Sequence, residues 1–304
     1  MSPTTIIDEG KLRLLLQDWE LGTVSEIAVL PGGSNSQTWK IAAQHGDFVA
    51  KVASDTAAFK GGLEIAEQLE LAGFSAGRPI RRRDGSLILR SSGRALGVIA
   101  FIPGTPLDLS QSAGMHTWGA TMARLHRALL LLPNVPVGVR RWPWRWLDHN
   151  ADHVRSRPWL RSAIIKAASQ ARKLKDTRDL TLGIIHGDGA PVIQDSGTGR
   201  VSVLDWGAAM WGPLMYDVAS AYWFSVIEPK LDPLLFEPFS KAYRVAAILN
   251  AQEWHDLPVF IRLRGAVQGF YFAWRCDNNI QTGLSYAGEN EQKLEDVRQK
   301  LESE

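Results

Sequence analysis

Two segments, Ile184-Ile185-His186-Gly187-Asp188 and Val203-Leu204-Asp205-Trp206-Gly207, each place an aspartate just after an apolar run. The apolar runs, at residues 182–185 and 201–204, have the length of strands, and a Ser-Gly-Thr-Gly turn lies between them. We expect the two runs to pair, which would bring Asp188 and Asp205 to one place. The alternative interpretation is a surface hairpin with two ordinary aspartates, because aspartate is common in loops.

Two adjacent carboxylates with different tasks suit phosphoryl transfer. One can orient or deprotonate an attacking hydroxyl, while the other holds Mg²⁺ against the phosphates of a nucleotide. The joint pattern of His186-Gly187-Asp188 and Asp205-Trp206-Gly207 resembles the catalytic and metal segments of the aminoglycoside phosphotransferase / choline kinase-like family. Tyr216-Asp217 also falls where that family has an aspartate that braces the catalytic loop.

This resemblance implies an α+β, protein kinase-like fold with two lobes. The expected N-lobe, residues 1–102, is a small antiparallel β-structure that binds the nucleotide. The expected C-lobe, residues 103–304, is mainly helical and carries the catalytic hairpin and the acceptor pocket. Asp188 is then the catalytic residue and Asp205 a metal ligand.

Composition sets the outer limits of the interpretation. The chain has 304 residues, of which 45% are hydrophobic and 22% charged, as in ordinary globular proteins. A formal net charge of +2 does not indicate a nucleic-acid partner, and the single cysteine, Cys276, excludes an internal disulfide. Because the N-terminus lacks the pattern of a signal peptide and no apolar run approaches a membrane span, we expect a cytoplasmic protein without a membrane partner. The oligomeric state stays open.

The first 52 residues carry two candidate phosphate-binding features. A turn-forming stretch at residues 31–36 separates strands expected at 27–30 and 38–42, and the resemblance implies that Gly32, Gly33 and Ser34 lie over the nucleotide phosphates. A plain hairpin loop is the alternative. Lys51 lies in an alternating strand at 48–52, where it could clamp the phosphates or, alternatively, keep an edge strand from aggregating.

A helix expected at residues 57–72 offers a partner for Lys51. Glu64 and Glu67 lie three residues apart and so share a face of that helix. By resemblance one of them orients Lys51, and we prefer Glu67; either could instead be a solvated helix charge. Residues 98–102, followed by Pro103, resemble the last N-lobe strand and the hinge, which implies that the backbone at Ala100 and Ile102 meets the adenine.

The rest of the chain reads as helical, and its tryptophans have two interpretations. Apolar periodicity predicts helices at residues 116–132, 162–175, 218–226, 234–249, 255–274 and 290–301. The Trp-rich residues 135–159 are a packed connection between helices or part of a substrate wall. A tryptophan cage could hold a quaternary ammonium, but core packing explains the same residues.

The chain departs from the family at Ile193. Relatives have a metal-binding asparagine there, and an isoleucine side chain cannot bind a hard cation. Gln194, one residue later, is the preferred replacement as a metal ligand. Asp195 could also bind the metal, or it could simply begin the turn. Alternatively, Asp205 and water molecules could form the whole metal site.

These patterns together predict a kinase that uses Mg²⁺ to transfer the γ-phosphoryl of ATP, or of another nucleotide, to a small-molecule hydroxyl. The acceptor could be an aminoglycoside-type antibiotic, an amino alcohol or another metabolite, although the basic residues 155–178 do not favour a polycation. The rival hypothesis is a non-catalytic, nucleotide- or ligand-binding pseudokinase.

Overall fold

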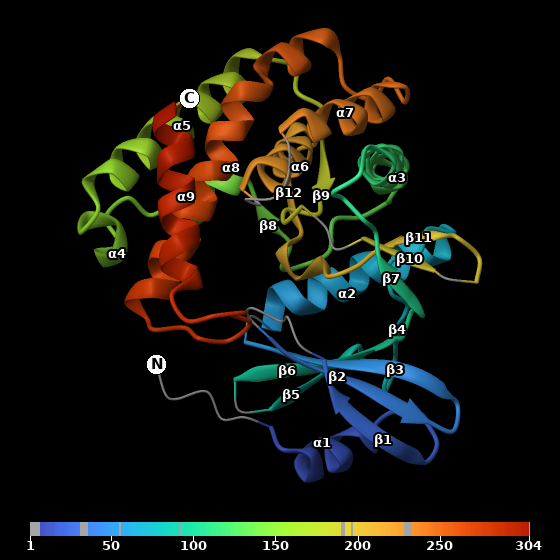
Figure 1. The fold of residues 1–304 in the computed structure, drawn as a ribbon. Helices are drawn as coiled ribbons and strands as arrows, with labels where there is room; N and C mark the ends of the chain where they lie inside the picture. The colour runs from blue at the N-terminus through green and yellow to red at the C-terminus, as the bar shows by residue number, and fades with distance from the viewer. Residues whose placement is uncertain are drawn as a thin grey trace.

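An antiparallel sheet occupies one end of the molecule and helices occupy the other (Figure 1). The computed structural model describes residues 7–30, 36–54, 56–91, 93–189, 192–195, 197–227 and 233–303. Gly32, Gly33 and Ser34, expected over the nucleotide phosphates, therefore lie outside the described residues. In the described part, no helix is long and apolar enough to cross a membrane.

The sheet has the strand order β1-β2-β3-β6-β4, with β5 also paired to β6. All of its pairs are antiparallel, as expected for the N-terminal part of the chain. One core packs helix α1 against the face of the sheet that carries Trp39, Ile41 and Phe48. The elements of this part are α1 (Glu9–Leu16), β1 (Val24–Val29), β2 (Ser36–Ala43), β3 (Gly46–Ala53), α2 (Thr56–Leu71), β4 (Pro79–Ile80), β5 (Ile88–Ser91) and β6 (Arg94–Ala100).

Strand β3 presents Lys51 on the face opposite to this core. Phe48, Ala50 and Val52 are buried while Lys51 is only partly covered, which is the alternation that the sequence predicts. Lys51 stands opposite Gly97 of β6, and a Cβ built on Gly97 would lie 2.9 Å from a methyl of Leu63 in α2. Lys51 therefore projects on the side of the sheet that α2 covers.

Helix α2 links the two parts of the molecule. In Figure 1 it runs between the sheet and the helical part. Phe59 and Leu63 pack with the sheet residues Leu87, Ile88 and Ala95. Ile65, Ala66 and Leu69 belong instead to the large core of the helical part. One amphipathic helix thus contributes apolar surface to both parts, which fixes how the sheet lies over the segment that holds Asp205.

The second part is mainly helical and contains two small sheets, ordered β11-β10-β7 and β8-β12-β9. A capping box of Asn250 and Glu253 starts its longest helix, α8, four residues earlier than the periodicity indicates. Its elements are β7 (Gly104–Pro106), α3 (Ser112–Leu130), β8 (Arg140–Arg141), the 3₁₀ helix η1 (Pro143–Trp146), α4 (Asp152–Arg155), α5 (Pro158–Thr177), β9 (Leu182–Ile185), β10 (Val192–Asp195), β11 (Val201–Val203), η2 (Trp206–Ala208), β12 (Met210–Pro213), α6 (Met215–Ile227), η3 (Pro233–Leu235), α7 (Phe236–Arg244), α8 (Ala251–Asp277) and α9 (Glu289–Ser303).

The expected pairing of residues 182–185 with 201–204 is wrong. Strand β9 pairs with β12, and β11 pairs with β10, which lies on the chain between the two predicted partners. The competing strands at residues 192–195 and 210–213 contain polar residues, glycine or proline and give weaker local signals. The loops that follow β9 and β11 nevertheless contact each other, because His186 packs against Leu204 and Trp206.

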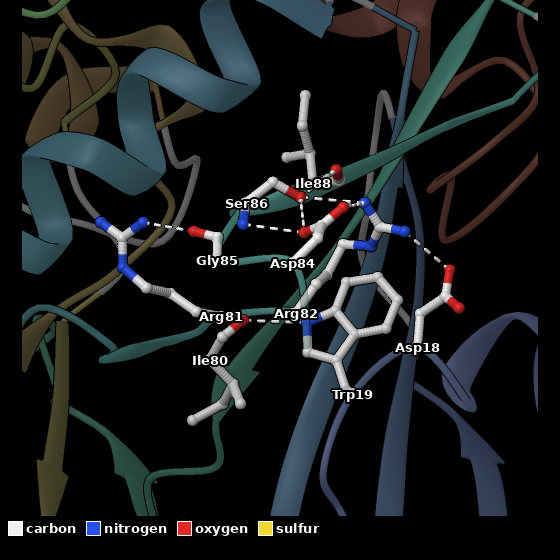
Figure 2. Close-up of polar contacts among 9 residues, drawn as sticks. All are labelled: Asp18, Trp19, Ile80, Arg81, Arg82, Asp84, Gly85, Ser86 and Ile88. Atoms are coloured by element: carbon white, nitrogen blue, oxygen red, sulfur yellow. Dashed lines mark hydrogen bonds and ion pairs between the residues drawn. The ribbon is translucent and has the colours of Figure 1, made fainter.

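A charged turn joins β4 to β5 (Figure 2). Arg82 donates to Asp18, Asp84 and Ser86, at 2.8, 2.6 and 2.9 Å, and so ties the turn to the segment after α1. Its neighbour Arg81 points the other way and donates to the carbonyl of Gly85 at 2.5 Å. This direction of Arg81 matters for the site, because the same side chain also reaches α2.

Candidate active site

The loop from His186 to Asp188, the candidate catalytic loop, is held by its backbone. The buried carboxylate of Asp217, near the start of α6, accepts hydrogen bonds from the amides of His186 at 2.7 Å and Gly187 at 2.8 Å. Gly187 has a φ of 85°, and a Cβ there would lie 2.4 Å from the carbonyl oxygen of Ala208. The glycine is therefore required by both conformation and space. The brace predicted for Asp217 is confirmed.

Asp217 is in turn part of a buried polar chain. His126 Nε2 lies 3.2 Å from the Asp217 carboxylate, and His126 Nδ1 lies 2.6 Å from the hydroxyl of Tyr243. Burial alone would raise the pKa of Asp217, but the hydrogen bond and charge of His126, the charge of His186 and the hydrogen bond from the Gly187 amide outweigh it and hold this pKa below its ordinary value. Helices α3 and α7 thereby support the catalytic loop, and His126 is structural, as the sequence suggests.

Asp205 meets Lys51 between the sheet and the helical part. Lys51 Nζ donates to Asp205 Oδ1 at 2.6 Å, and 51% of the aspartate side chain stays exposed. Desolvation alone would raise the pKa of Asp205, but the charge and hydrogen bond of Lys51 outweigh it and hold this pKa below its ordinary value. Because β3 lies between β2 and β6, the edge-strand explanation of Lys51 is excluded.

Close packing around Trp206 brings the two loops together. Asp205 adopts a left-handed conformation, with φ and ψ both 65°, and turns the chain into η2. His186 Nε2 lies 2.8 Å from the carbonyl oxygen of Leu204, and its ring packs edge-on against Trp206 at 4.8 Å. On the other side, a Cβ on Gly62 of α2 would lie only 2.4 Å from the carbonyl oxygen of Trp206. The loop of Asp188, the loop of Asp205 and helix α2 thus form one packed unit.

The expected contact between Lys51 and Glu67 does not form. Glu67 accepts two hydrogen bonds from Arg81, at 2.7 and 2.5 Å, and Glu64 pairs with Lys60 one helical turn before it. Each glutamate has a cation within easier reach, and Lys51 bonds Asp205 directly. The sequence does place Arg81 in a charged turn after β4. It does not show that this turn folds toward α2, where Arg81 meets Glu67.

Sequence reasoning missed Arg264, which reaches Asp188 from α8. Its Nη2 donates to Asp188 Oδ1 at 2.8 Å and its Nη1 to the carbonyl of Gly187 at 3.0 Å. Burial alone would lower the pKa of Arg264, but the neighbouring Tyr216 and Asp188 outweigh it and raise this pKa above its ordinary value. A local signal existed: a cation stands on the apolar stripe of a helix, three and four residues after buried Ile261 and Phe260.

The candidate metal ligands are distributed unevenly. Gln194 pairs with Val201 toward the turn of the β10–β11 hairpin, while Asp205 follows the opposite end of β11. The Gln194 amide lies near the carbonyl of Gly199, in a hollow lined mainly by α3 residues. The structure therefore separates Gln194 from Asp205. Asp195 accepts from the amides of Gly197 and Thr198 at 2.9 and 2.7 Å, so it serves the turn, as its alternative interpretation states.

Of the two backbone positions expected to meet the adenine, Ala100 and Ile102, the structure leaves the amide of Ile102 available. The amide of Ala100 donates to the carbonyl of Arg78 at 2.8 Å, and that of Phe101 to Asp47 at 3.0 Å. Within the described part of the chain, the amide of Ile102, which follows β6, forms no hydrogen bond to another backbone group. Of the two positions, Ile102 is the one that can offer its amide to a ligand.

The tryptophans of residues 135–159 are packed rather than arranged as a cage. Trp142 and Trp144 stack with ring centroids 5.0 Å apart, and Trp144 is only 5% exposed. Both pack with the large core, as do Trp146 and Trp159. Core packing therefore accounts for them.

Comparison with solved structures identifies the fold class. The chain superimposes on an amicoumacin kinase in complex with AMP-PNP and Ca²⁺ with a TM-score of 0.75, over 98% of this chain and 94% of that one, at 14% identity. A microcompartment-associated aminopropanol kinase gives 0.69 over 95% and 94%, at 18% identity. A spectinomycin phosphotransferase bound to ADP and spectinomycin gives 0.67 over 96% and 97%, at 15% identity. The chain has the two-lobed, kinase-like α+β fold that the sequence predicts.

The sequence itself identifies the family. The profile of the phosphotransferase enzyme family matches residues 26–257, and the chain belongs to this family. Similar curated proteins include homoserine kinases of Methylorubrum populi, 25% identical over 62% of this chain and 60% of that protein, and of Sinorhizobium fredii, 27% identical over 62% and 59%. The homoserine kinase of Methylocella silvestris is 24% identical over 72% and 70%. The match thus spans about 60% of the length of the first two relatives.

Proposed function

We propose that this protein is a small-molecule kinase that transfers the γ-phosphoryl group of ATP to an acceptor hydroxyl. The observation that carries the proposal is the 2.6 Å contact of Lys51 with Asp205, formed by residues 154 apart and next to the braced loop of Asp188. Folding alone gives little reason to place this ion pair where two lobes meet. A nucleotide whose phosphates contact the lysine and whose metal contacts the aspartate accounts for both groups.

The residues present fit a magnesium ion with a single protein ligand. Asp205 offers an exposed carboxylate, whereas Ile193 offers no donor and Gln194 lies toward the hairpin turn. Mg²⁺ usually retains several waters and needs only one or two carboxylates besides substrate phosphates. When bound, such an ion would neutralise charge on the phosphates. We therefore assign the metal to Asp205, and Gln194 is not part of this proposal.

The remaining steps are assigned to the chain's own groups. Lys51 would bind the nucleotide phosphates, and the Ile102 backbone would contact the adenine. Asp188, on a loop held by Asp217, would accept a hydrogen bond from the acceptor hydroxyl and take its proton as the phosphoryl group is transferred. Because phosphoryl transfer is catalysed mainly by positioning and charge stabilisation, the rigid support of Asp188 is itself part of the mechanism.

The charges of the site favour an acceptor that is not a polycation. Asp188 is paired with Arg264, and Asp205 with Lys51, so each candidate site carboxylate already faces a cation. A polycationic aminoglycoside would gain little from carboxylates neutralised in this way. We therefore propose a small acceptor with one amine or none, such as an amino alcohol or a hydroxy amino acid.

A turnover assay with an acceptor panel tests this proposal. ADP release from MgATP would be measured with L-homoserine, aminopropanol, choline, spectinomycin and hygromycin B, and the product phosphate ester identified by mass. We expect turnover with one of the first three compounds, a strong reduction to a residual rate in Asp188→Asn, and full retention in the matched control Asp195→Asn. A folded Asp188→Asn protein with full turnover would remove Asp188 from the mechanism. Metal-independent nucleotide binding in a thermal-shift assay, without turnover on any acceptor, would instead identify a pseudokinase.

A further inference from the structure

One buried guanidinium, that of Arg264, supports the catalytic loop. Arg264 projects from α8 and contacts both the backbone and the side chain of the loop: the Gly187 carbonyl and the Asp188 carboxylate. It also lies 3.4 Å from the hydroxyl of Tyr216. The single planar group therefore fixes two atoms of neighbouring residues at once, which a flexible ammonium cannot do with the same geometry.

The two partners of this ion pair differ sharply in exposure. The Arg264 side chain is 6% exposed and the Asp188 side chain 63% exposed. The cation is thus covered by protein while the carboxylate faces outward. The contact with Arg264 engages Oδ1 of Asp188, and in a side chain this exposed Oδ2 remains available to an acceptor hydroxyl.

The packing of α8 explains how the arginine comes so close. The next residue is Gly265, and a Cβ there would lie 2.1 Å from the Trp223 ring of α6. The glycine lets α8 approach α6 closely, which places Arg264 beside Tyr216 at the start of α6. Within the described part of the chain, the buried Nε of Arg264 has no hydrogen-bond partner. A buried polar atom without a hydrogen bond lowers the stability of the fold. Stability alone therefore does not explain why an arginine occupies position 264.

We propose that Arg264 is a positioning residue that acts through Asp188. It holds one carboxylate oxygen so that the other is presented to the acceptor hydroxyl, and its charge lets the nucleotide phosphates approach Asp188 without meeting an unpaired anion. This inference rests on the proposed kinase function.

The same helix provides a matched control. Arg275 is 1% exposed and cross-links α8 to α9 and to the segment before it, donating to the Asn290 side chain of α9 at 2.7 Å and to the Thr282 carbonyl at 2.5 Å. Arg275→Met therefore removes a buried arginine of α8 away from the catalytic loop. Comparing it with Arg264→Met separates loss of stability from loss of positioning.

Steady-state kinetics with MgATP and an acceptor from the panel provide the main test. We expect Arg264→Met to lower kcat on the order of 100-fold with little change in the KM for MgATP. The kcat of Arg264→Lys should lie between those of Arg264→Met and the wild type, because lysine keeps the charge but loses the planar pair of N–H donors. Arg275→Met should lower the melting temperature while retaining kcat. In an Asp188→Asn background, Arg264→Met should cause little further loss, because the arginine acts through that carboxylate.

Two results would overturn the proposal: equal kcat in Arg264→Met and wild type, or a full additional loss in the Asp188→Asn background. If the wild type turned over no acceptor, the proposed function would fail, and hydrogen exchange of residues 182–189 would still test the positioning role. Faster exchange of this segment in Arg264→Met but not in Arg275→Met supports positioning. Equal exchange in both variants refutes it.

Discussion

The contact between α2 and the Asp205 segment leads to a quantitative prediction for Gly62→Ala. A Cβ at this position would lie 2.4 Å from the carbonyl oxygen and 2.7 Å from the carbonyl carbon of Trp206. Ordinary contacts are about 1 Å longer, so helix or loop must move by roughly that amount. Trp206 is 4% exposed, and its indole is bonded to the carbonyls of Ala76 and Val203, so the loop cannot yield easily.

Two opposing terms set the size of the effect. Replacing glycine by alanine inside a helix stabilises it by about 1 kcal/mol, whereas overpacking costs about 1–3 kcal/mol. Because the obstacle is backbone, we take the upper part of that range and expect a net loss of about 1–2 kcal/mol. A displacement near 1 Å at Asp205 should also lower turnover on the order of 100-fold.

Gly61→Ala is the matched control on the same helix. Its Cβ would lie 3.2 Å from the carbonyl oxygen of Val137, a residue that is 89% exposed, so the neighbour can shift by a few tenths of an ångström. We expect its free energy of unfolding to stay within about 1 kcal/mol of the wild type, with normal turnover. Urea unfolding and MgATP turnover of both variants provide the measurement. A Gly62→Ala protein as stable and as active as Gly61→Ala would refute the close approach.

Three further predictions concern single side chains. Asp217→Ala should cost about 3–5 kcal/mol in urea unfolding near neutral pH, because it removes the anion of a buried, hydrogen-bonded network. Since the pKa of Asp217 is depressed in the folded protein, this contribution is complete above the unfolded-state pKa of about 4 and is lost as the pH falls through the folded-state value. The stability difference from wild type should therefore narrow in acid; a constant difference would contradict the assignment. Glu67→Gln should retain most turnover, because Glu67 bonds Arg81 rather than Lys51; a loss as severe as that of Lys51→Met would restore the original expectation. Gln194→Ala should leave the Mg²⁺ concentration for half-maximal turnover unchanged and Ile193→Asn should lower it; a raised requirement in Gln194→Ala would make the glutamine a ligand after all.

The sequence alone determined the features that depend on neighbouring residues. Alternation in residues 48–52 showed that Lys51 stands on the face opposite to Phe48 and Ala50, since the side-chain period of a strand is two. The apolar run before His186 located β9 and the catalytic loop after it. The departure at Ile193 was visible as a change of residue type, because only the chemistry of the side chain is needed to exclude it as a metal ligand.

Tertiary structure decided which of several similar partners each group meets. Strand β9 pairs with β12 instead of β11, and Glu67 bonds Arg81 instead of Lys51. Short apolar strands and surface charges are interchangeable over short distances, so their pairing depends on which partner the whole chain brings nearest. Arg264 lies 76 residues from Asp188 along the chain, and their contact requires α8, α6 and the catalytic loop to be packed together. The local sequence pattern therefore gives the chemistry of each side chain, and tertiary packing selects the partner that it contacts.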